Sequence, residues 1–428
     1  MKVCVIGAGA GGLSAAKHSL EAGLEVVVFE KSDEIGGMWV YREETGKYKY
    51  GLDIHTSNYR GLRTNLPREA MGYPDFPITI GEKSFLTADE VQSFHHIYAD
   101  YFDLKRHIKL LHSVILVQPY AETQWKITTK DLANNRMFSS IFDFVLICNG
   151  INNSPHIPIY RDQDKFLGKQ LHSHEYRSKD IFRGEQVLIV GSGASAYDLF
   201  SDAKEVATYV VQSYRGGTVN MFSHYNIGTR YPDIDRFTSK EVVFVDGRKE
   251  IFSMVVYCTG YCYNFPFLSP ACGITTKGND FVSPLWQHCI NINGPTMAFI
   301  GLCHFVPASQ IMDIQIRFTL KFFTGVKSLP SREEMLASEA HEIAKRFEKG
   351  IKKAHYLGVP FLDQYQRAIA RLAQIKPLSP TTIGIFMLIQ KIGESDLLSL
   401  RNHDFKIVNN YTFTCSNPVN INKREIKF

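Results

Sequence analysis

The stretch "KVCVIGAGAGGLSAAKHSLEAGLEVVVFEKS", residues 2–32, decides the fold. A short apolar run leads into Gly7, Gly9 and Gly12, which have the spacing G-x-G-x-x-G. A helix-like segment and a second apolar run follow, and that run ends on Glu30, 18 residues after Gly12. The order strand, turn, helix, strand and acid is typical of a dinucleotide-binding unit.

Each position in this unit has a chemical reason. The first glycine allows a tight turn, the second lets the backbone approach a pyrophosphate, and the third lets helix and strand pack closely. The helix N-terminus presents unpaired N–H groups to the phosphates, and the carboxylate accepts hydrogen bonds from ribose hydroxyls. We expect strands at 3–6 and 24–29 and a helix C-cap at Gly23. The residues expected to bind this first dinucleotide are Gly7, Ala8, Gly9, Ala10, Gly11, Gly12 and Glu30.

A second unit, "EQVLIVGSGASAYDLFSDAKEVATYVVQSYRGG", occupies residues 185–217 and has the spacing G-x-G-x-x-A. We expect its strands at 187–190 and 207–212. Where the first unit has an acid, this one has Ser213, with Arg215 two residues beyond. A carboxylate would repel a ribose 2′-phosphate, whereas a hydroxyl and a guanidinium would bind one, so this site should prefer NADPH. The residues expected to bind it are Gly191, Gly193, Ser195, Ala196, Tyr197, Asp198, Ser213 and Arg215.

Two such units in one chain predict two dinucleotides that meet. Because two nicotinamides would have nothing to exchange, the first should be a flavin, FAD. The predicted fold is α/β, with two Rossmann-like domains and the NADPH domain inserted into the FAD domain. Apolar strands are expected at 142–150 and 251–261, on either side of the second unit. We interpret them as the places where the chain leaves the first domain and returns to it. The expected limits are 1–155 and 266–428 for the two parts of the FAD domain, the second with a C-terminal helical region, and 156–265 for the NADPH domain.

Composition excludes several other classes of protein. The 428 residues are 44% apolar and 21% charged, with a net charge of +5 and no concentrated basic block, which argues against nucleic-acid binding. The eight cysteines are scattered without C-x-x-C spacing, and no metal-ligand pattern occurs. No apolar run approaches the ~20 residues of a membrane span. Because the chain opens directly on a strand, we expect a cytoplasmic protein, with secretion open if a precursor carries a leader.

Outside the two units, most of the sequence predicts scaffold. Thr87 with Glu90, and Ser331 with Glu334, have capping-box spacing at the start of helices. The segment "FLGKQLHSHEY", residues 166–176, fits neither a regular strand nor a regular helix.

That segment carries a resemblance to a known family. Phe166, Gly168, His172 and Tyr176 match the pattern F-x-G-x-x-x-H-x-x-x-Y/F that precedes the NADPH turn of class B flavin-containing monooxygenases. The chain is most similar to the short insect enzymes of that family, which include alkaloid N-oxygenases. One departure is Ala194, which stands where the family commonly has an Asn contact to NADP. The resemblance implies a role in detoxification and a homodimer.

Other stretches are similar to the family's cofactor-contacting segments: "EKSDEIGGMWVY" from residue 30, "LRTNLPREAMGYPDFP" from 62, "YCTGYCYNFPFL" from 257 and "IMDIQIRF" from 311. The resemblance fades after about residue 325. The further cofactor contacts that this resemblance implies are Met38, Trp39, Thr64, Asn65, Leu66 and Gln315.

The resemblance also implies a reaction. NADPH reduces FAD, oxygen adds to give a hydroperoxyflavin, and a small-molecule amine or sulfide takes one oxygen atom as an N-oxide or S-oxide. The protein then needs no general base, but it must exclude water and hold the peroxide by hydrogen bonds. Asn65 is the catalytic candidate, because its amide can donate to the peroxide and accept from a cofactor group.

Alternatives remain at this stage. A Baeyer–Villiger monooxygenase would use the same scaffold, although that group usually has Trp where this chain has Tyr176. A disulfide reductase would need a cysteine pair near the flavin. A non-oxygenating NADPH sensor would keep both units and make no product. At single residues, Asn65 could be a turn residue before Pro67, and Arg215 could be a solvated loop charge.

Overall fold

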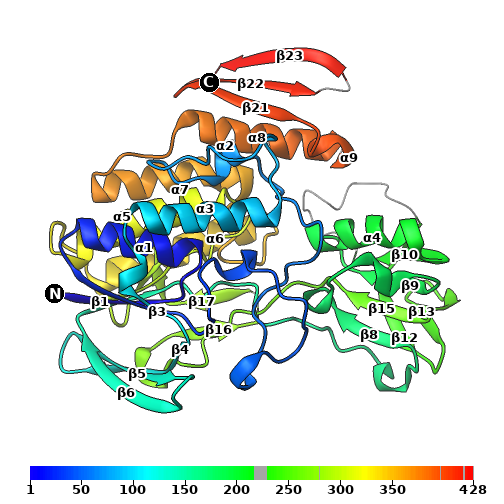
Figure 1. The fold of residues 1–428 in the computed structure, drawn as a ribbon, viewed down its shortest axis with the longest axis horizontal. Helices are drawn as coiled ribbons and strands as arrows, with labels where there is room; N and C mark the ends of the chain where they lie inside the picture. The colour runs from blue at the N-terminus through cyan, green and yellow to red at the C-terminus, as the bar shows by residue number, and fades with distance from the viewer. Residues whose placement is uncertain (216–228, 279, 396, 418–419, 428) are drawn as a thin grey trace.

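The computed structural model describes residues 1–215, 229–278, 280–395, 397–417 and 420–427. Two mainly parallel sheets form its framework, and they lie side by side, each with helices packed on it (Figure 1). The second sheet is built from residues 169–257, whereas the first uses strands from before and after that stretch. The predicted α/β class is therefore confirmed. The exact domain limits stay a prediction.

The first sheet has seven strands in the order β18-β19-β20-β7-β1-β2-β3. Its strands are β1 (Lys2–Ile6), β2 (Glu25–Phe29), β3 (Ile108–Lys109), β7 (Phe144–Ile147), β18 (Leu285–Trp286), β19 (Ile290–Asn291) and β20 (Met297–Phe299). Side chains alternate between the two faces because a strand has a period of two. Val3 and Val5 of β1 pack into the core under the helices, whereas Cys4 and Ile6 belong to the core on the other face.

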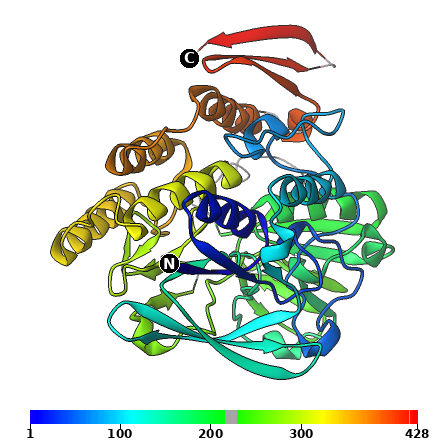
Figure 2. The ribbon, with the colours of Figure 1, turned by 60° about the vertical axis from the view of Figure 1, so that its left-hand side comes forward.

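Each face of the first sheet has its own cover. The helical face carries α1 (Ala10–Glu21), α3 (Ala88–Tyr101), α5 (Ala308–Phe323) and α7 (Gly358–Ala373). The other face carries the antiparallel sheet of β4 (His112–Tyr120), β5 (Gln124–Asp131) and β6 (Arg136–Phe142), which lies at the bottom of Figure 2. Burial on both faces explains why β7 and residues 3–6 of β1 are apolar.

The second sheet has five parallel strands in the order β11-β10-β9-β15-β8. They are β8 (Lys169–His172), β9 (Gln186–Val190), β10 (Tyr209–Ser213), β11 (Arg230–Tyr231) and β15 (Met254–Tyr257). Val187 and Ile189 of β9 pack towards α4 (Ala194–Val206). Leu188 and Val190 face the antiparallel strands β12 (Ile234–Phe237), β13 (Glu241–Phe244) and β14 (Lys249–Ile251).

The C-terminal part adds helices and a small sheet above the first domain (Figures 1 and 2). It comprises α6 (Arg332–Glu348), α7, α8 (Pro380–Ser395), α9 (Leu397–Leu400), β21 (Asp404–Asn409), β22 (Thr412–Asn417) and β23 (Asn420–Lys427). Short elements complete the described structure: α2 (Arg68–Met71), β16 (Thr275–Lys277) and β17 (Phe281–Ser283). Among the described helices, none combines the length and apolarity needed to cross a membrane.

Most predicted elements agree with the structure to within two residues. Both capping boxes form, at the start of α3 and of α6. The predicted helix cap was off by one, because Ala22 is the C-cap of α1 and Gly23 is the left-handed residue after it. The strand expected at 251–261 lies in the second sheet, as β15, so the chain returns to the first domain after it.

The segment 166–176 is more regular than predicted. Residues 169–172 form the edge strand β8, and residues 173–175 form a 3₁₀ turn. Strand β8 lies at the edge of its sheet and is largely exposed, so its side chains need not alternate between apolar and polar. This is why its sequence has no recognisable strand pattern. Gly168 lies just before it, where a Cβ atom would be 2.5 Å from the Phe166 ring and 2.8 Å from the Ser253 carbonyl oxygen.

Gly168→Ala should therefore destabilise the second domain by roughly 1–3 kcal/mol, because the added methyl group would overlap the Phe166 ring and the Ser253 carbonyl oxygen. Gly193→Ala is the matched control, since nothing lies within 4 Å of a Cβ there. Denaturant unfolding of the two variants checks this. Equal stability of Gly168→Ala and the wild type would contradict the packing described here.

Candidate active site

The first glycine turn has the close contacts that its sequence predicts. Gly7 has a φ of +101°, and a Cβ atom there would be 2.6 Å from the Cys148 carbonyl oxygen. A Cβ atom on Gly12 would overlap the carbonyl oxygen of Gly7. Gly9 is the N-cap of α1 and makes no side-chain hydrogen bond, so the N–H groups of this helix end stay available for a phosphate. A Cβ atom on Gly9 would lie 3.5 Å from Gly37, so the space above the turn is bounded by backbone.

Glu30 is buried beside this turn. Its Oε2 accepts a hydrogen bond of 2.8 Å from the backbone N–H of Ala8, and its Oε1 accepts two of 2.8 Å from Ser32. A carboxylate has about four acceptor positions, so capacity remains for a ribose hydroxyl. These residues fit a dinucleotide with a free ribose. Two neighbouring residues that were predicted to contact this dinucleotide are held by the surrounding protein. The Ala10 carbonyl accepts a hydrogen bond from Tyr73 Oη at 2.7 Å, and Gly11 faces Met312.

The second glycine turn is equally constrained. Gly191 has a φ of +128°, and a Cβ atom there would overlap the Cys258 carbonyl. Gly193 caps α4 without a side-chain hydrogen bond and opens to free space. Ala196 is fully buried against the sheet, and Ser195 lies half-buried in the first turn of the helix. The open N-terminus of α4 thus fits a second pyrophosphate.

The segment of residues 54–65 lies against both units. Near the first, Thr56 Oγ1 donates to the Met38 carbonyl at 2.9 Å, and Asn58 Nδ2 donates to the Trp39 carbonyl at 3.0 Å. Near the second, Tyr59 Oη donates to Asp198 Oδ2 at 2.5 Å. One segment therefore connects the predicted flavin-contacting residues with the helix of the second unit.

Asn65 stands at the end of this segment. Its Oδ1 accepts a hydrogen bond from Nη2 of Arg401, a residue of the C-terminal part. Thr64 is held by two bonds to Leu86, from its backbone N–H at 2.9 Å and to its Oγ1 at 3.0 Å. Leu66 packs between the main core and the C-terminal core. The peptide around Asn65 is thus fixed on both sides.

Asp198 does more than the sequence predicted. Besides the bond from Tyr59, its carboxylate forms a bidentate pair with Arg401, at 2.9 and 3.0 Å. Burial of Tyr59 beside Asp198 raises the pKa of its hydroxyl well above the ordinary value, so this group donates at all relevant pH values. Tyr197, next to Asp198, packs against the C-terminal core.

The residues expected to read the 2′-phosphate differ in their surroundings. Ser213 ends β10, is fully buried, and donates its hydroxyl to the Pro232 carbonyl at 2.6 Å. Arg215 is 68% exposed and pairs with Asp233, with 3.0 Å between Nε and Oδ2. The guanidinium is therefore held just beyond the end of β10 by this ion pair.

Gln315 lies apart from this arrangement. It is fully buried on α5, where its Oε1 accepts from the Gly301 N–H at 3.1 Å and its Nε2 donates to Tyr365 Oη at 2.9 Å. Its predicted contact with a cofactor stays a prediction.

The segment of residues 166–176 contacts the first domain through His174, whose Nε2 donates to the Ile54 carbonyl at 2.7 Å. His172 Nε2 donates to the Gly260 carbonyl at 3.0 Å, while its Nδ1 accepts from the His174 N–H at 3.0 Å. Burial lowers the pKa of His172 to about 4, so the ring is neutral and braces the loop instead of exchanging protons. Tyr176 is fully buried, stacks on Phe182, and donates to Asp202 at 2.5 Å.

Sequence reasoning missed three residues of this region. They are Tyr59, Arg177 and Arg401. Tyr59 and Arg401 both bond to Asp198. Arg177 is buried, and among the hydrogen bonds found here it bonds only to carbonyl oxygens. Tyr59 and Arg177 lie next to recognised segments, which was the available signal. Arg401 follows "LLSL" in a part of the chain without a motif, and nothing in its local sequence marks it.

The chemistry that this arrangement allows is binding and orientation. Around the turns lie open helix N-termini, a buried carboxylate and an amide. Within the part of the chain that the structure describes, no three His, Cys, Asp or Glu side chains are placed to hold a metal ion. Any oxidation here would depend on the bound dinucleotides.

Gly193→Ala provides a direct test of the second turn. Because a methyl group would project into the space above α4, we expect the Michaelis constant for NADPH to rise about tenfold or more, while folding and flavin content remain unchanged. Steady-state kinetics with the flavin absorbance as control measures both. An unchanged constant would mean that the nucleotide does not approach this turn.

Comparison with known proteins agrees with this geometry. The family model described as flavin-binding monooxygenase-like matches residues 1–232 and 227–387. The likeness therefore extends well beyond residue 325, so the expectation that it fades there is wrong.

Similar proteins carry related names. Senecionine N-oxygenase of Tyria jacobaeae is 31% identical over 417 residues, which cover 96% of this chain and 91% of that protein. The flavin-containing monooxygenase FMO GS-OX5 of Arabidopsis thaliana is 33% identical, over 84% of this chain and 82% of its own length. The structure of S-allyl-L-cysteine S-oxygenase from Allium sativum superposes with a TM-score of 0.84 at 27% identity, over 94% of both chains. On this match and the two glycine turns together, the chain belongs to the flavin-binding monooxygenase-like family.

Proposed function

We propose that this protein is an NADPH-dependent flavin monooxygenase that transfers one oxygen atom to the nitrogen of a small tertiary amine of the alkaloid type. The observation that carries the proposal is the segment 54–65, which contacts the Met38–Trp39 backbone and Asp198 and ends at Asn65. Such a segment is suited to bring a flavin and a nicotinamide to one amide side chain. The senecionine N-oxygenase relative supports nitrogen as the acceptor atom.

When bound, FAD and NADPH supply the reducing power and the activation of oxygen. The protein supplies the rest. Gly7–Gly12 and Glu30 hold one dinucleotide, and the turn at Gly191–Gly193 holds the other. Asn65 has its amide oxygen occupied by Arg401, so its Nδ2 group remains as a donor. The buried Thr64 and half-buried Leu66 beside it limit the entry of water.

Sulfur oxygenation is the second candidate. The Allium sativum structure supports it, since that protein is named for S-oxygenation of a cysteine derivative. Soft sulfur and amine nitrogen react with the same kind of electrophilic oxygen, so the two substrates differ in how they fit and not in the chemistry required. Ketone oxidation has less support, because Tyr176 stands where the ketone-oxidising group usually has Trp.

Compartment and assembly are further proposals. All eight cysteines are free and seven of them are buried, which supports a reducing compartment such as the cytoplasm. A homodimer is supported by the family resemblance. Cell fractionation and sedimentation of the purified protein address the two points.

Asn65→Leu tests the role of the amide. Loss of one preorganised donor at a reacting centre costs on the order of 10²–10³ in rate, so oxygenated product should fall steeply while NADPH oxidation continues and releases hydrogen peroxide. The measurement is the mass-detected product, heavier by one oxygen atom, per NADPH consumed, with a tertiary amine and a thioether as substrates. Asn402→Leu makes the same exchange at an exposed asparagine and should leave the ratio unchanged.

Three outcomes would contradict the proposal in different ways. An unchanged ratio in Asn65→Leu with full flavin content would remove the residue from the reaction. Loss of flavin or of stability would identify Asn65 as a structural turn residue. A wild-type protein that binds both dinucleotides and oxygenates no substrate would be a sensor.

Arg215→Ala tests cofactor preference. A charge-assisted bond is worth ~1.5–3 kcal/mol. Because Arg215 is 68% exposed, the lower end applies, which is about tenfold in the Michaelis constant for NADPH. The constant for NADH should stay nearly the same. An equal loss with both nucleotides would show that the arginine does not read the 2′-phosphate.

A further inference from the structure

Among the hydrogen bonds described here, Arg401 is the one residue of the C-terminal part that bonds both to residues 63–65 and to Asp198 of the second nucleotide unit. Its guanidinium has five N–H donors in a planar fork. Nε donates to the Thr64 carbonyl at 3.2 Å, and Nη2 donates to the Arg63 carbonyl at 3.3 Å and to Asn65 Oδ1. Nη1 and Nη2 also bind the two oxygens of Asp198.

The contact with Asn65 determines which way that amide faces. A guanidinium can only donate, so the amide atom in front of it must be the oxygen. The Nδ2 group is thereby turned away from Arg401 and is left as the free donor. Without this partner the amide could rotate by half a turn and present its oxygen instead.

The contact with Asp198 fixes where Arg401 stands. Burial opposes its charge, but the neighbouring carboxylate outweighs burial and raises the pKa of Arg401 above its ordinary value. The side chain is 25% exposed, and Asp198 is 10% exposed, so the pair is largely shielded from water. A bidentate pair of this kind fixes the orientation of the guanidinium in addition to compensating its charge.

Contacts of the C-terminal sheet with the first domain position Arg401 beside Asn65 and Asp198. The Phe405 N–H donates to Ser84 Oγ at 2.7 Å, and the Phe405 ring packs at 6.3 Å from that of Phe85. Ala70 and Leu66 belong to the same apolar cluster. Because Arg401 lies just before the start of β21, this docking sets the position of its backbone.

We propose that Arg401 is a positioning residue that orients the Asn65 amide towards the cofactors and couples residues 63–65 to Asp198 of the NADPH-binding helix. The proposal rests on the monooxygenase function given above. It assigns to the C-terminal segment, which carries no family motif, a part in the efficiency of oxygen transfer.

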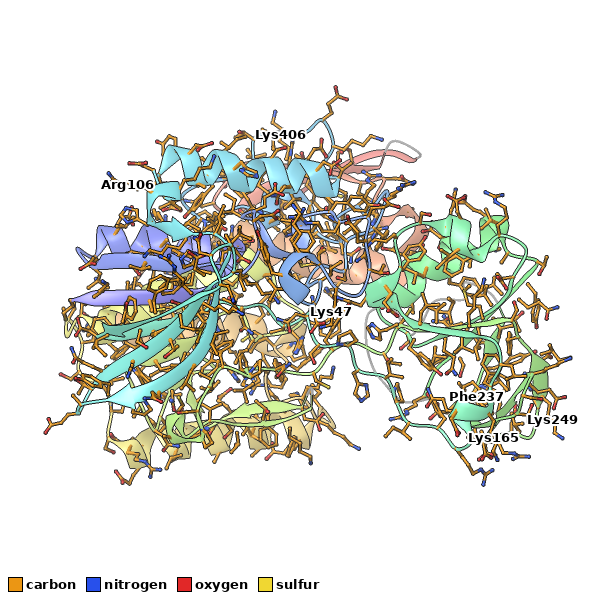
Figure 3. The ribbon with its side chains drawn as sticks, turned by 60° about the horizontal axis from the view of Figure 1, so that its bottom comes forward. Lys47, Arg106, Lys165, Phe237, Lys249 and Lys406 are labelled. Atoms are coloured by element: carbon orange, nitrogen blue, oxygen red, sulfur yellow. The ribbon has the colours of Figure 1, made fainter. Side chains whose placement is uncertain are left out.

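Arg401→Gln and Arg401→Lys test this, with Lys406→Gln as the control on the exposed side of β21 (Figure 3). Since misplacement of a reacting group costs about 10- to 100-fold, Arg401→Gln should lower the rate of oxygenation by that factor and raise hydrogen peroxide per NADPH, at full flavin content. Arg401→Lys keeps the charge at Asp198 and should recover part of the rate. Lys406→Gln should behave as the wild type.

A double variant distinguishes positioning from general structural support. If Arg401 acts through the amide, Arg401→Gln should add less than about threefold in the Asn65→Leu background, far below its effect in the wild type. Full additivity, or an unchanged ratio of product to NADPH in both Arg401 variants, would overturn the proposal.

Hydrogen–deuterium exchange gives a readout that needs no turnover. In Arg401→Gln, peptides covering residues 60–70 and 194–200 should exchange faster than in the wild type and in Lys406→Gln. Unchanged exchange of both peptides would refute the coupling. A wild-type protein without oxygenated product would refute the function instead, and the exchange result would still decide whether Arg401 joins the two segments.

Discussion

A buried arginine holds the two halves of the molecule together. Arg177 is 6% exposed, and its donors bind five backbone carbonyl oxygens, those of Arg42, Glu44, Thr56, His174 and Tyr176. A buried cation is tolerated when its donors are satisfied, and leaving it unpaired costs several kcal/mol. If residues 42–56 of the first domain separated from the segment around residues 166–177, the charge of Arg177 would lose hydrogen-bond partners. This constraint places residues 54–65 against both nucleotide units.

The catalytic geometry follows from that placement. Once residues 54–65 are fixed, Tyr59 reaches Asp198, and Asn65 and Asp198 share Arg401 as a hydrogen-bond partner. Neither turn alone explains a reaction, since each binds a nucleotide. Residues 54–65 connect the two units, and this connection is what would let the two bound nucleotides react with each other.

The fold could be predicted from sequence because its decisive constraints are local. Gly12 is dictated by a backbone contact with Gly7 within one turn, and the capping boxes by residues three apart. The joining residues could not be predicted in this way. Arg401 meets Asn65 across 336 positions of sequence, and Arg177 binds carbonyl oxygens, which every residue has and no pattern reveals.

Ser213 shows the same limit at a single residue. Its position at the end of β10 was predicted, and its surroundings were not. The hydroxyl is bonded to the Pro232 carbonyl, which lies in the connection between β11 and β12. Chemical type and spacing identify candidates, but the partner that a side chain has in the folded state decides which of them are free to bind.

The central claim is that two dinucleotides meet at one place, and anaerobic mixing of the FAD-bound protein with NADPH tests it most directly. If the account is right, the visible absorbance of the flavin bleaches on mixing. Deuterium at the transferred position of NADPH should then slow the bleaching, because hydride passes directly between the cofactors. A flavin that stays oxidised with NADPH but bleaches with dithionite would contradict the account, since the two sites would then not face each other.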